Sequence, residues 1–160
     1  MTKPTLGAEA PDFTLLTDTG ESLTLNALRG RPVVLFFYPK DDTEACTTEA
    51  CGFRDLFPVL HDVGAWVVGV SPDGVLSHTK FKKKYALPFP LVADTEHEVA
   101  ERYGVWREKT MFGNRYMGIV RTTFLLDAEG RIAHVFEKVK ASGHADEVAR
   151  TLKTLGLARG

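Results

Sequence analysis

The apolar residues of this chain fall into continuous runs and into helical spacings, a combination that predicts an α/β fold. Residues 32–38 and 65–71 are almost continuously apolar, which is typical of strands buried on both faces of a sheet. Other segments carry apolar residues three or four positions apart, as amphipathic helices do. The predicted strands are residues 13–16, 22–25, 32–38, 65–71, 91–93, 122–126 and 131–136, and the predicted helices are 44–62, 71–85, 96–103 and 145–155.

Turn residues and prolines separate these segments. Asp18-Thr19-Gly20 predicts a hairpin near the N-terminus, and residues 127–130 predict a second hairpin further along the chain. Pro58 predicts a kink or an early end in the helix expected at 44–62. Strands that alternate with helices and finish in a hairpin predict a three-layer α/β fold with a mixed central sheet. Because no linker, repeat or low-complexity tract interrupts the pattern, we expect one domain over residues 1–160.

Composition narrows the class of protein. The chain is 44% hydrophobic and 26% charged, with a formal net charge of -1, so its charge does not favour nucleic acid or an anionic membrane as a partner. No apolar run approaches the roughly 20 residues of a membrane helix. The first residues lack the charged-then-apolar pattern of a secretory signal, so we expect a cytoplasmic protein.

The chain has two cysteines, Cys46 and Cys51, separated by four residues. In a reducing cytoplasm such a pair is more often redox-active or metal-binding than structural. A metal site usually needs four ligands, and neither a second cysteine pair nor a closely spaced histidine pair follows. Redox chemistry is therefore the better interpretation.

Cys46 is placed where a thiol is easily activated. The predicted strand 32–38 has ended and a helix is beginning, so the free N–H groups of the first helical turn favour a thiolate over a thiol. Thr43 stands three residues earlier, at the spacing of an N-cap whose hydroxyl meets that turn. A cap alone would also explain Thr43, and the two roles are compatible.

The motif Pro39-x-x-x-Thr43-x-x-Cys46 resembles the active-site motif of peroxiredoxins. The surrounding sequence resembles their Q-type subgroup, the bacterioferritin comigratory proteins, and the resemblance covers nearly the whole chain. The segments that carry it are residues 37–43, 46–55, 87–91, 103–106, 116–119 and 121–125.

The resemblance implies a single-domain thioredoxin-like fold and a thiol peroxidase that reduces hydrogen peroxide and organic hydroperoxides. Cys46 would be the peroxidatic cysteine, and Cys51 would resolve its sulfenic acid by closing an intramolecular disulfide. Thioredoxin or a similar dithiol protein would then reduce the disulfide. No metal, haem or flavin cofactor is implied, and we expect a monomer.

The resemblance also assigns the peroxide pocket to Pro39, Thr43, Cys46 and Arg121, with Glu49 orienting the arginine. Cleavage of an O–O bond leaves an oxyanion, which a fixed guanidinium and nearby donors would stabilise as it forms. Arg suits this task because it stays charged and offers a rigid fork of donors.

Two positions depart from the subgroup, which usually has Pro-Gly where this chain has Glu44-Ala45. Glu44 favours the helix through its dipole but repels a thiolate. Because Thr43 and Cys46 are kept, we expect this change to affect the rate rather than the type of reaction.

Two other functions remain open from the residues. A thioredoxin-like dithiol exchanger normally uses Cys-x-x-Cys and a cis-proline opposite the cysteines, and here four residues intervene and the facing segment reads Arg121-Thr122-Thr123. A redox sensor would need the same activated thiolate but would consume a single equivalent of peroxide. Turnover in the presence of a dithiol separates a peroxidase from a switch.

Overall fold

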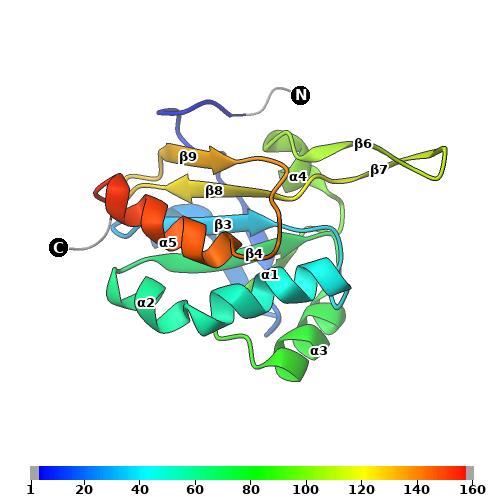
Figure 1. Ribbon diagram of the computed structural model, residues 1–160, viewed down its shortest axis with the longest axis horizontal. Helices are drawn as coiled ribbons and strands as arrows, with labels where there is room; N and C mark the ends of the chain where they lie inside the picture. The colour runs from blue at the N-terminus through cyan, green and yellow to red at the C-terminus, as the bar shows by residue number, and fades with distance from the viewer. Residues whose placement is uncertain (1–3, 158–160) are drawn as a thin grey trace.

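The computed structural model describes residues 4–157 of the chain (Figure 1). Five α-helices, a short 3₁₀-helix and nine strands are present in this part. The strands are β1 (Thr14–Leu16), β2 (Ser22–Thr24), β3 (Val33–Phe37), β4 (Trp66–Ser71), β5 (Leu91–Ala93), β6 (Trp106–Met111), β7 (Asn114–Ile119), β8 (Thr122–Leu126) and β9 (Ile132–Phe136). The helices are η1 (Leu25–Leu28), α1 (Glu44–Asp55), α2 (Phe57–Asp62), α3 (Val75–Tyr85), α4 (Glu98–Arg102) and α5 (His144–Thr154).

The central sheet has five strands in the order β5-β4-β3-β8-β9. Strands β3, β4 and β5 run parallel, while β8 is antiparallel to both β3 and β9. The predicted mixed sheet is therefore confirmed. The predicted N-terminal hairpin is confirmed as well, because β1 and β2 pair antiparallel as a separate ribbon.

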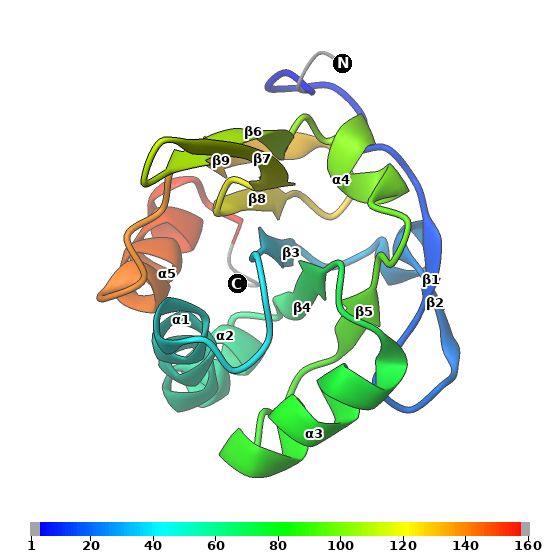
Figure 2. The same ribbon diagram turned by 90° about the vertical axis from the view of Figure 1, so that its right-hand side faces the viewer.

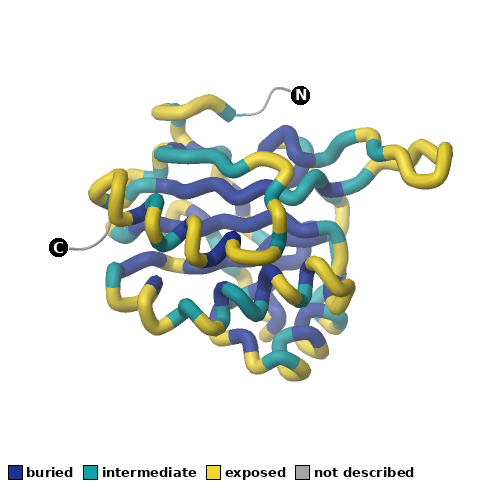
Figure 3. The backbone as a smooth tube through the Cα atoms, viewed as in Figure 1, coloured by how far each residue is buried: buried dark blue, intermediate teal, exposed yellow. Residues whose placement is uncertain are grey.

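The two faces of the sheet are covered by different elements, which makes three layers (Figure 2). Along β3 successive side chains alternate between the faces, and every one of them is buried. Helices α1, α2, α3 and α5 add apolar side chains to the cluster on one face, and α4, η1 and the N-terminal segment add theirs to the other. Figure 3 shows that the central strands are buried, while the outer surfaces of the helices and loops are exposed.

The predicted helix at 44–62 is two helices. Residue Leu56 separates α1 from α2, and Pro58 lies in the first turn of α2. A proline is tolerated there because the first turn of a helix has no partner for its backbone N–H. The expected interruption is confirmed.

The helix predicted to start at Ser71 begins later, at Val75. The Ser71 hydroxyl instead donates to the Asp73 carboxylate at 2.7 Å, and the same carboxylate oxygen accepts the Asp41 backbone N–H at 2.7 Å. These polar side chains hold a loop against the segment that follows β3, so they do not cap a helix. The expected helix at 96–103 is likewise shorter, because α4 spans only Glu98–Arg102.

The sequence pattern did not predict the hairpin formed by β6 and β7, which projects from the body of the molecule (Figure 1). Its strands are joined by a two-residue turn, Phe112-Gly113, with φ values of 53° and 80°. Both values lie in the left-handed region that tight hairpin turns require. Within residues 4–157, no helix is long and apolar enough to cross a bilayer.

Candidate active site

The six candidate residues lie in the loop after β3, in the helix α1 that follows it, and just before the neighbouring strand β8. Pro39 and Thr43 lie between β3 and α1, Cys46 and Glu49 lie in α1, and Arg121 directly precedes β8. Because β3 and β8 are antiparallel neighbours, the end of β3 lies beside the start of β8. The fold therefore brings Arg121 to the first turns of α1 across 75 positions of sequence.

The Arg121 guanidinium joins the buried cysteine to a buried carboxylate. Its Nη2 donates to Cys46 Sγ at 3.3 Å, and its Nη1 donates to Glu49 Oε1 at 2.7 Å. Cys46 and Glu49 are three residues apart, so they lie on one face of α1. Each of the two is 1% exposed, which keeps water from competing strongly for the guanidinium. The structure therefore brings these three side chains together.

Burial sets the protonation of Glu49. Desolvation raises the pKa of this carboxyl to about 7, and the charge and hydrogen bond of Arg121 reduce the effect without cancelling it. Its second oxygen, Oε2, has no hydrogen-bond partner among the described residues. For Arg121, burial works against the charged form, but the attraction of Glu49 and Cys46 leaves its pKa raised. The arginine therefore stays cationic beside the sulfur.

The proposed cap by Thr43 is only partly right. Thr43 is the N-cap residue of α1, with extended backbone angles, but its side chain makes no capping hydrogen bond. The hydroxyl donates instead to the Lys40 carbonyl at 3.0 Å. The bond thus stabilises the loop between β3 and α1 and does not cap the helix. Pro39 is half-buried at the start of the same loop.

Cys46 and Cys51 are both free thiols, and both lie inside α1. Residues five positions apart on an ideal helix have Cα atoms about 8.6 Å apart. A disulfide requires less than about 7 Å. A bond between these cysteines therefore requires α1 to open locally.

Comparison with known proteins agrees with this geometry. The AhpC/TSA family matches residues 6–135 of the chain. A putative peroxiredoxin bcp of Coxiella burnetii is 53% identical over 92% of this chain and 97% of its own length. Peroxiredoxin Bcp of Bacillus subtilis is 48% identical over 94% of this chain and 96% of its own length.

The solved structures give the same answer. The bacterioferritin comigratory protein of Xanthomonas campestris superposes with a TM-score of 0.87 at 41% identity, covering 94% of this chain and 96% of that one. A Cys-to-Ser mutant of PrxQ from Xylella fastidiosa superposes with a TM-score of 0.92 at 34% identity, covering 98% and 99%. The chain belongs to the peroxiredoxin family. As a peroxiredoxin it is a thiol peroxidase with a thioredoxin-like fold, which confirms the expected family, fold class and activity.

One charged residue near the site, Lys109, was not predicted from the sequence of this peroxiredoxin. Lys109, in β6, lies close enough to the site for Arg121 and Cys46 to influence its charge, and its pKa is lowered by partial burial first and then by Arg121. Its ammonium donates to the Ile119 carbonyl at 2.9 Å, across the β6–β7 hairpin. The Phe112-Gly113 turn was the signal that could have revealed this hairpin, and with it the lysine.

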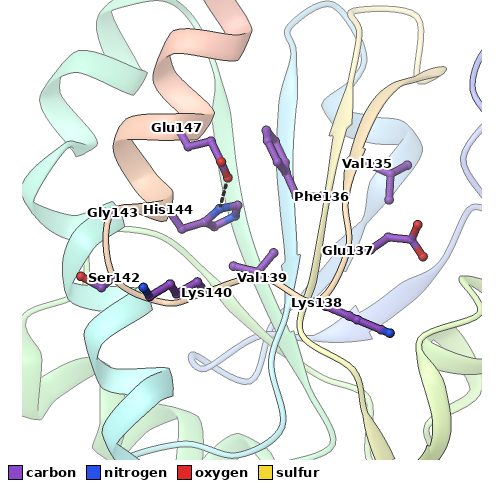
Figure 4. A pocket seen from close by; sticks show the side chains of 10 residues that line it. All are labelled: Val135, Phe136, Glu137, Lys138, Val139, Lys140, Ser142, Gly143, His144 and Glu147. Atoms are coloured by element: carbon purple, nitrogen blue, oxygen red, sulfur yellow. Dashed lines mark hydrogen bonds and ion pairs between the residues drawn. The ribbon is translucent and has the colours of Figure 1, made fainter.

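A cleft of about 460 Å³ lies between the end of β9 and the start of α5 (Figure 4), and Val139 in its wall donates its backbone N–H to the Arg121 carbonyl at 3.0 Å. Its wall includes the buried His144, whose Nε2 meets the Thr123 hydroxyl at 2.8 Å and whose Nδ1 meets Glu147 at 3.1 Å. Burial lowers the pKa of His144, against the opposing effect of Glu147. None of the six candidate residues lines this cleft. Within residues 4–157, no three His, Cys, Asp or Glu side chains gather in a way that could hold a metal ion.

Proposed function

We propose that Cys46 is the peroxide-reacting residue of this thiol peroxidase. Its thiolate attacks one oxygen of the peroxide, so an S–O bond forms while the O–O bond breaks. The leaving oxygen departs as an alkoxide or hydroxide and takes up a proton, and Cys46 becomes a sulfenic acid. Both hydrogen peroxide and organic hydroperoxides can undergo this step.

The observation that supports this assignment is the contact between Arg121 and Cys46. The guanidinium reaches the sulfur at 3.3 Å while Glu49 holds its other nitrogen at 2.7 Å. A cation fixed in this way stabilises the thiolate before the attack and the oxyanion that forms during it. Cys51 is half-buried and feels the charge of Arg54, but among the described residues it receives no guanidinium hydrogen bond, so the two thiols differ in their activation.

Pro39 and Thr43 are proposed to shape the peroxide pocket. Thr43 fixes the loop through its bond to Lys40, and Pro39 restricts the backbone where that loop leaves β3. Both residues would exclude water from the sulfur and position the peroxide oxygens beside Arg121.

Cys51 is proposed to resolve the sulfenic acid. Its thiolate attacks Cys46 Sγ, an S–S bond forms, and the hydroxyl leaves as water after protonation. Thioredoxin or a similar dithiol protein would then reduce the disulfide by thiol exchange. Because one chain supplies both cysteines, a single domain over residues 1–160 can complete the cycle as a monomer, and we place it in the cytoplasm.

Turnover measurements test these roles. The wild-type protein should consume many equivalents of peroxide per chain when a dithiol reductant is present. Cys46→Ser should consume none, while Cys51→Ser should consume about one equivalent and stop as sulfenic acid or oxidise further. Consumption of a single equivalent by the wild type would identify a redox switch instead, and turnover by Cys46→Ser would overturn the assignment of Cys46.

A further inference from the structure

The last residue of α3, Tyr85, contacts both ends of the segment that carries the two cysteines. Its hydroxyl donates to Asp42 Oδ1 at 2.8 Å, directly before the N-cap of α1. Its backbone carbonyl accepts Arg54 Nη1 at 2.9 Å, in the last turn of α1. One residue outside α1 thus holds positions 42 and 54, and the cysteines at 46 and 51 lie between them.

The contact before α1 fixes a backbone conformation that is uncommon for residues other than glycine. Asp42 has φ of 59°, in the left-handed region. Both oxygens of its carboxylate are occupied, because Lys84 Nζ donates to Oδ2 at 2.8 Å while Tyr85 donates to Oδ1. The end of α3 therefore holds the loop in the conformation from which α1 starts.

The contact at the other end of α1 satisfies a carbonyl that a helix leaves free. Tyr85 is the last residue of α3, where carbonyl groups lack an intrahelical partner. The Arg54 guanidinium supplies the missing hydrogen-bond donor, and its Nε also donates to Asp55 at 3.0 Å. A cation suits the position because the C-terminal end of a helix dipole is negative. Arg54 follows Cys51 by three residues, so the bond fixes the helical turn that contains the second thiol.

We propose that Tyr85 is a positioning residue that keeps α1 closed and thereby sets the rate at which Cys51 reaches oxidised Cys46. This inference rests on the proposed roles of the two cysteines. Closing the disulfide shortens the distance between positions 46 and 51, so the backbone must move within a segment whose two ends are tied to α3. Each tie opposes the movement because the folded helix has the bond and the opened helix has to release or strain it.

The consequence is a competition for the sulfenic acid. In the resolving reaction the Cys51 thiolate displaces the hydroxyl of Cys46, which gives the disulfide and, after protonation, water. In the competing reaction a second peroxide transfers an oxygen atom to Cys46, which gives a sulfinic acid and an alcohol or water. A slower opening of α1 leaves more time for the second reaction. The ties to Tyr85 therefore set the peroxide concentration at which the enzyme inactivates.

Two variants release the ties one at a time. Tyr85→Phe keeps the ring and the backbone carbonyl but removes the hydroxyl that binds Asp42. Arg54→Leu keeps an apolar stem but donates no hydrogen bond to the Tyr85 carbonyl. Tyr85→Phe removes one hydrogen bond, so we expect disulfide formation to become about three to five times faster. Arg54→Leu removes two, one to the Tyr85 carbonyl and one to the neighbouring Asp55, and we expect disulfide formation to be faster than in the wild type there as well. Tyr116→Phe removes a hydroxyl from the projecting hairpin and serves as the matched control.

The test measures two rates after rapid mixing with hydrogen peroxide, the loss of the Cys46 thiol and the later formation of the disulfide. The first rate should be unchanged in both variants, because neither residue touches the sulfur, and the second should rise. The peroxide concentration that gives half sulfinic acid should rise by the same factor. A general loss of packing would instead slow the first rate too, and that result would overturn the proposal.

Disulfide formation at the wild-type rate in both Tyr85→Phe and Arg54→Leu would also overturn it. The same experiment separates this failure from a failure of the proposed function. If the wild-type protein forms no Cys46–Cys51 disulfide at all, the assignment of Cys51 is wrong. If it forms the disulfide and only the variants fail to differ from it, the inference about Tyr85 alone is wrong.

Discussion

Substituting Gly52 tests whether α1 must open during the catalytic cycle. Gly52 follows Cys51 within the helix, and a Cβ added there would lie 3.5 Å from Ala145 Cβ of α5, an ordinary packing distance. Gly52→Ala therefore fits the closed structure without displacing a neighbour. The backbone effect favours the helix by about 1 kcal/mol over glycine. Partial burial of the added methyl group contributes up to about 0.8 kcal/mol more.

The closed helix should thus gain about 1–2 kcal/mol relative to the opened one, and the open population should fall roughly 5- to 30-fold. Disulfide formation should slow by a similar factor, while the first reaction with peroxide keeps its rate. Quenched-flow mixing followed by thiol alkylation and mass spectrometry measures both steps. At high peroxide the variant should also accumulate more sulfinic acid on Cys46.

Hydrogen exchange gives an independent measurement of the same event. Amide protection of residues 44–55 should fall sharply when the wild-type disulfide forms. In Gly52→Ala the protection should fall more slowly after oxidation, because the disulfide forms more slowly. The reasoning is refuted if disulfide formation is equally fast in both proteins. Equal amide protection in the reduced and disulfide forms would mean that α1 does not open.

Two further predictions concern the charges around Cys46. Arg121→Lys keeps the charge but loses the two-pronged contact with Cys46 and Glu49, so it should already slow the attack on peroxide. Arg121→Ala should lower the second-order rate constant with peroxide by about 10²- to 10³-fold. Near wild-type rates in both variants would remove Arg121 from the site. Glu49→Gln should alter the pH dependence of stability: the folded carboxyl has a pKa of about 7 against an ordinary 4.5, so its stabilising contribution is complete below about pH 4.5 and is lost as the pH rises through 7. Urea unfolding at pH 5 and pH 8 should show a decline on the order of 3 kcal/mol for the wild type that is absent in Glu49→Gln, and equal declines would contradict the burial argument.

The sequence predicted the parts of the fold that depend on local pattern. The buried strands β3 and β4 appear as continuous apolar runs, and Pro58 marks the break between α1 and α2. The β6–β7 hairpin was not predicted because its strands are largely exposed and mix charged with apolar residues. Burial therefore imposes no alternation of apolar and polar residues along them. Its turn also uses Phe112 where asparagine or glycine is usual, so Gly113 alone carried a weak turn signal.

Only the part of the site that lies within a short sequence motif could be predicted from the residues themselves. The short spacing from Pro39 to Cys46 is local, but the contacts of Arg121 with Cys46 and Glu49 depend on how β8 pairs with β3, and only the family resemblance pointed to them. The hydroxyl of Thr43 shows the limit of capping rules, because a loop carbonyl competes with the helix for the same donor. The contacts of Tyr85 with both ends of α1 have no sequence signature, since they arise from the packing of α3 against a distant segment.

The most direct test of the account is to find which sulfur is oxidised first. The reduced protein is mixed with less than one equivalent of hydrogen peroxide in the presence of a reagent that traps sulfenic acids, then cleaved after lysine and arginine. Both cysteines fall on one peptide, residues 41–54, so fragmentation between positions 46 and 51 has to locate the trapped group. We expect the label on Cys46 at the earliest times. A label that appears first on Cys51 would contradict the central claim and reverse the roles of the two thiols.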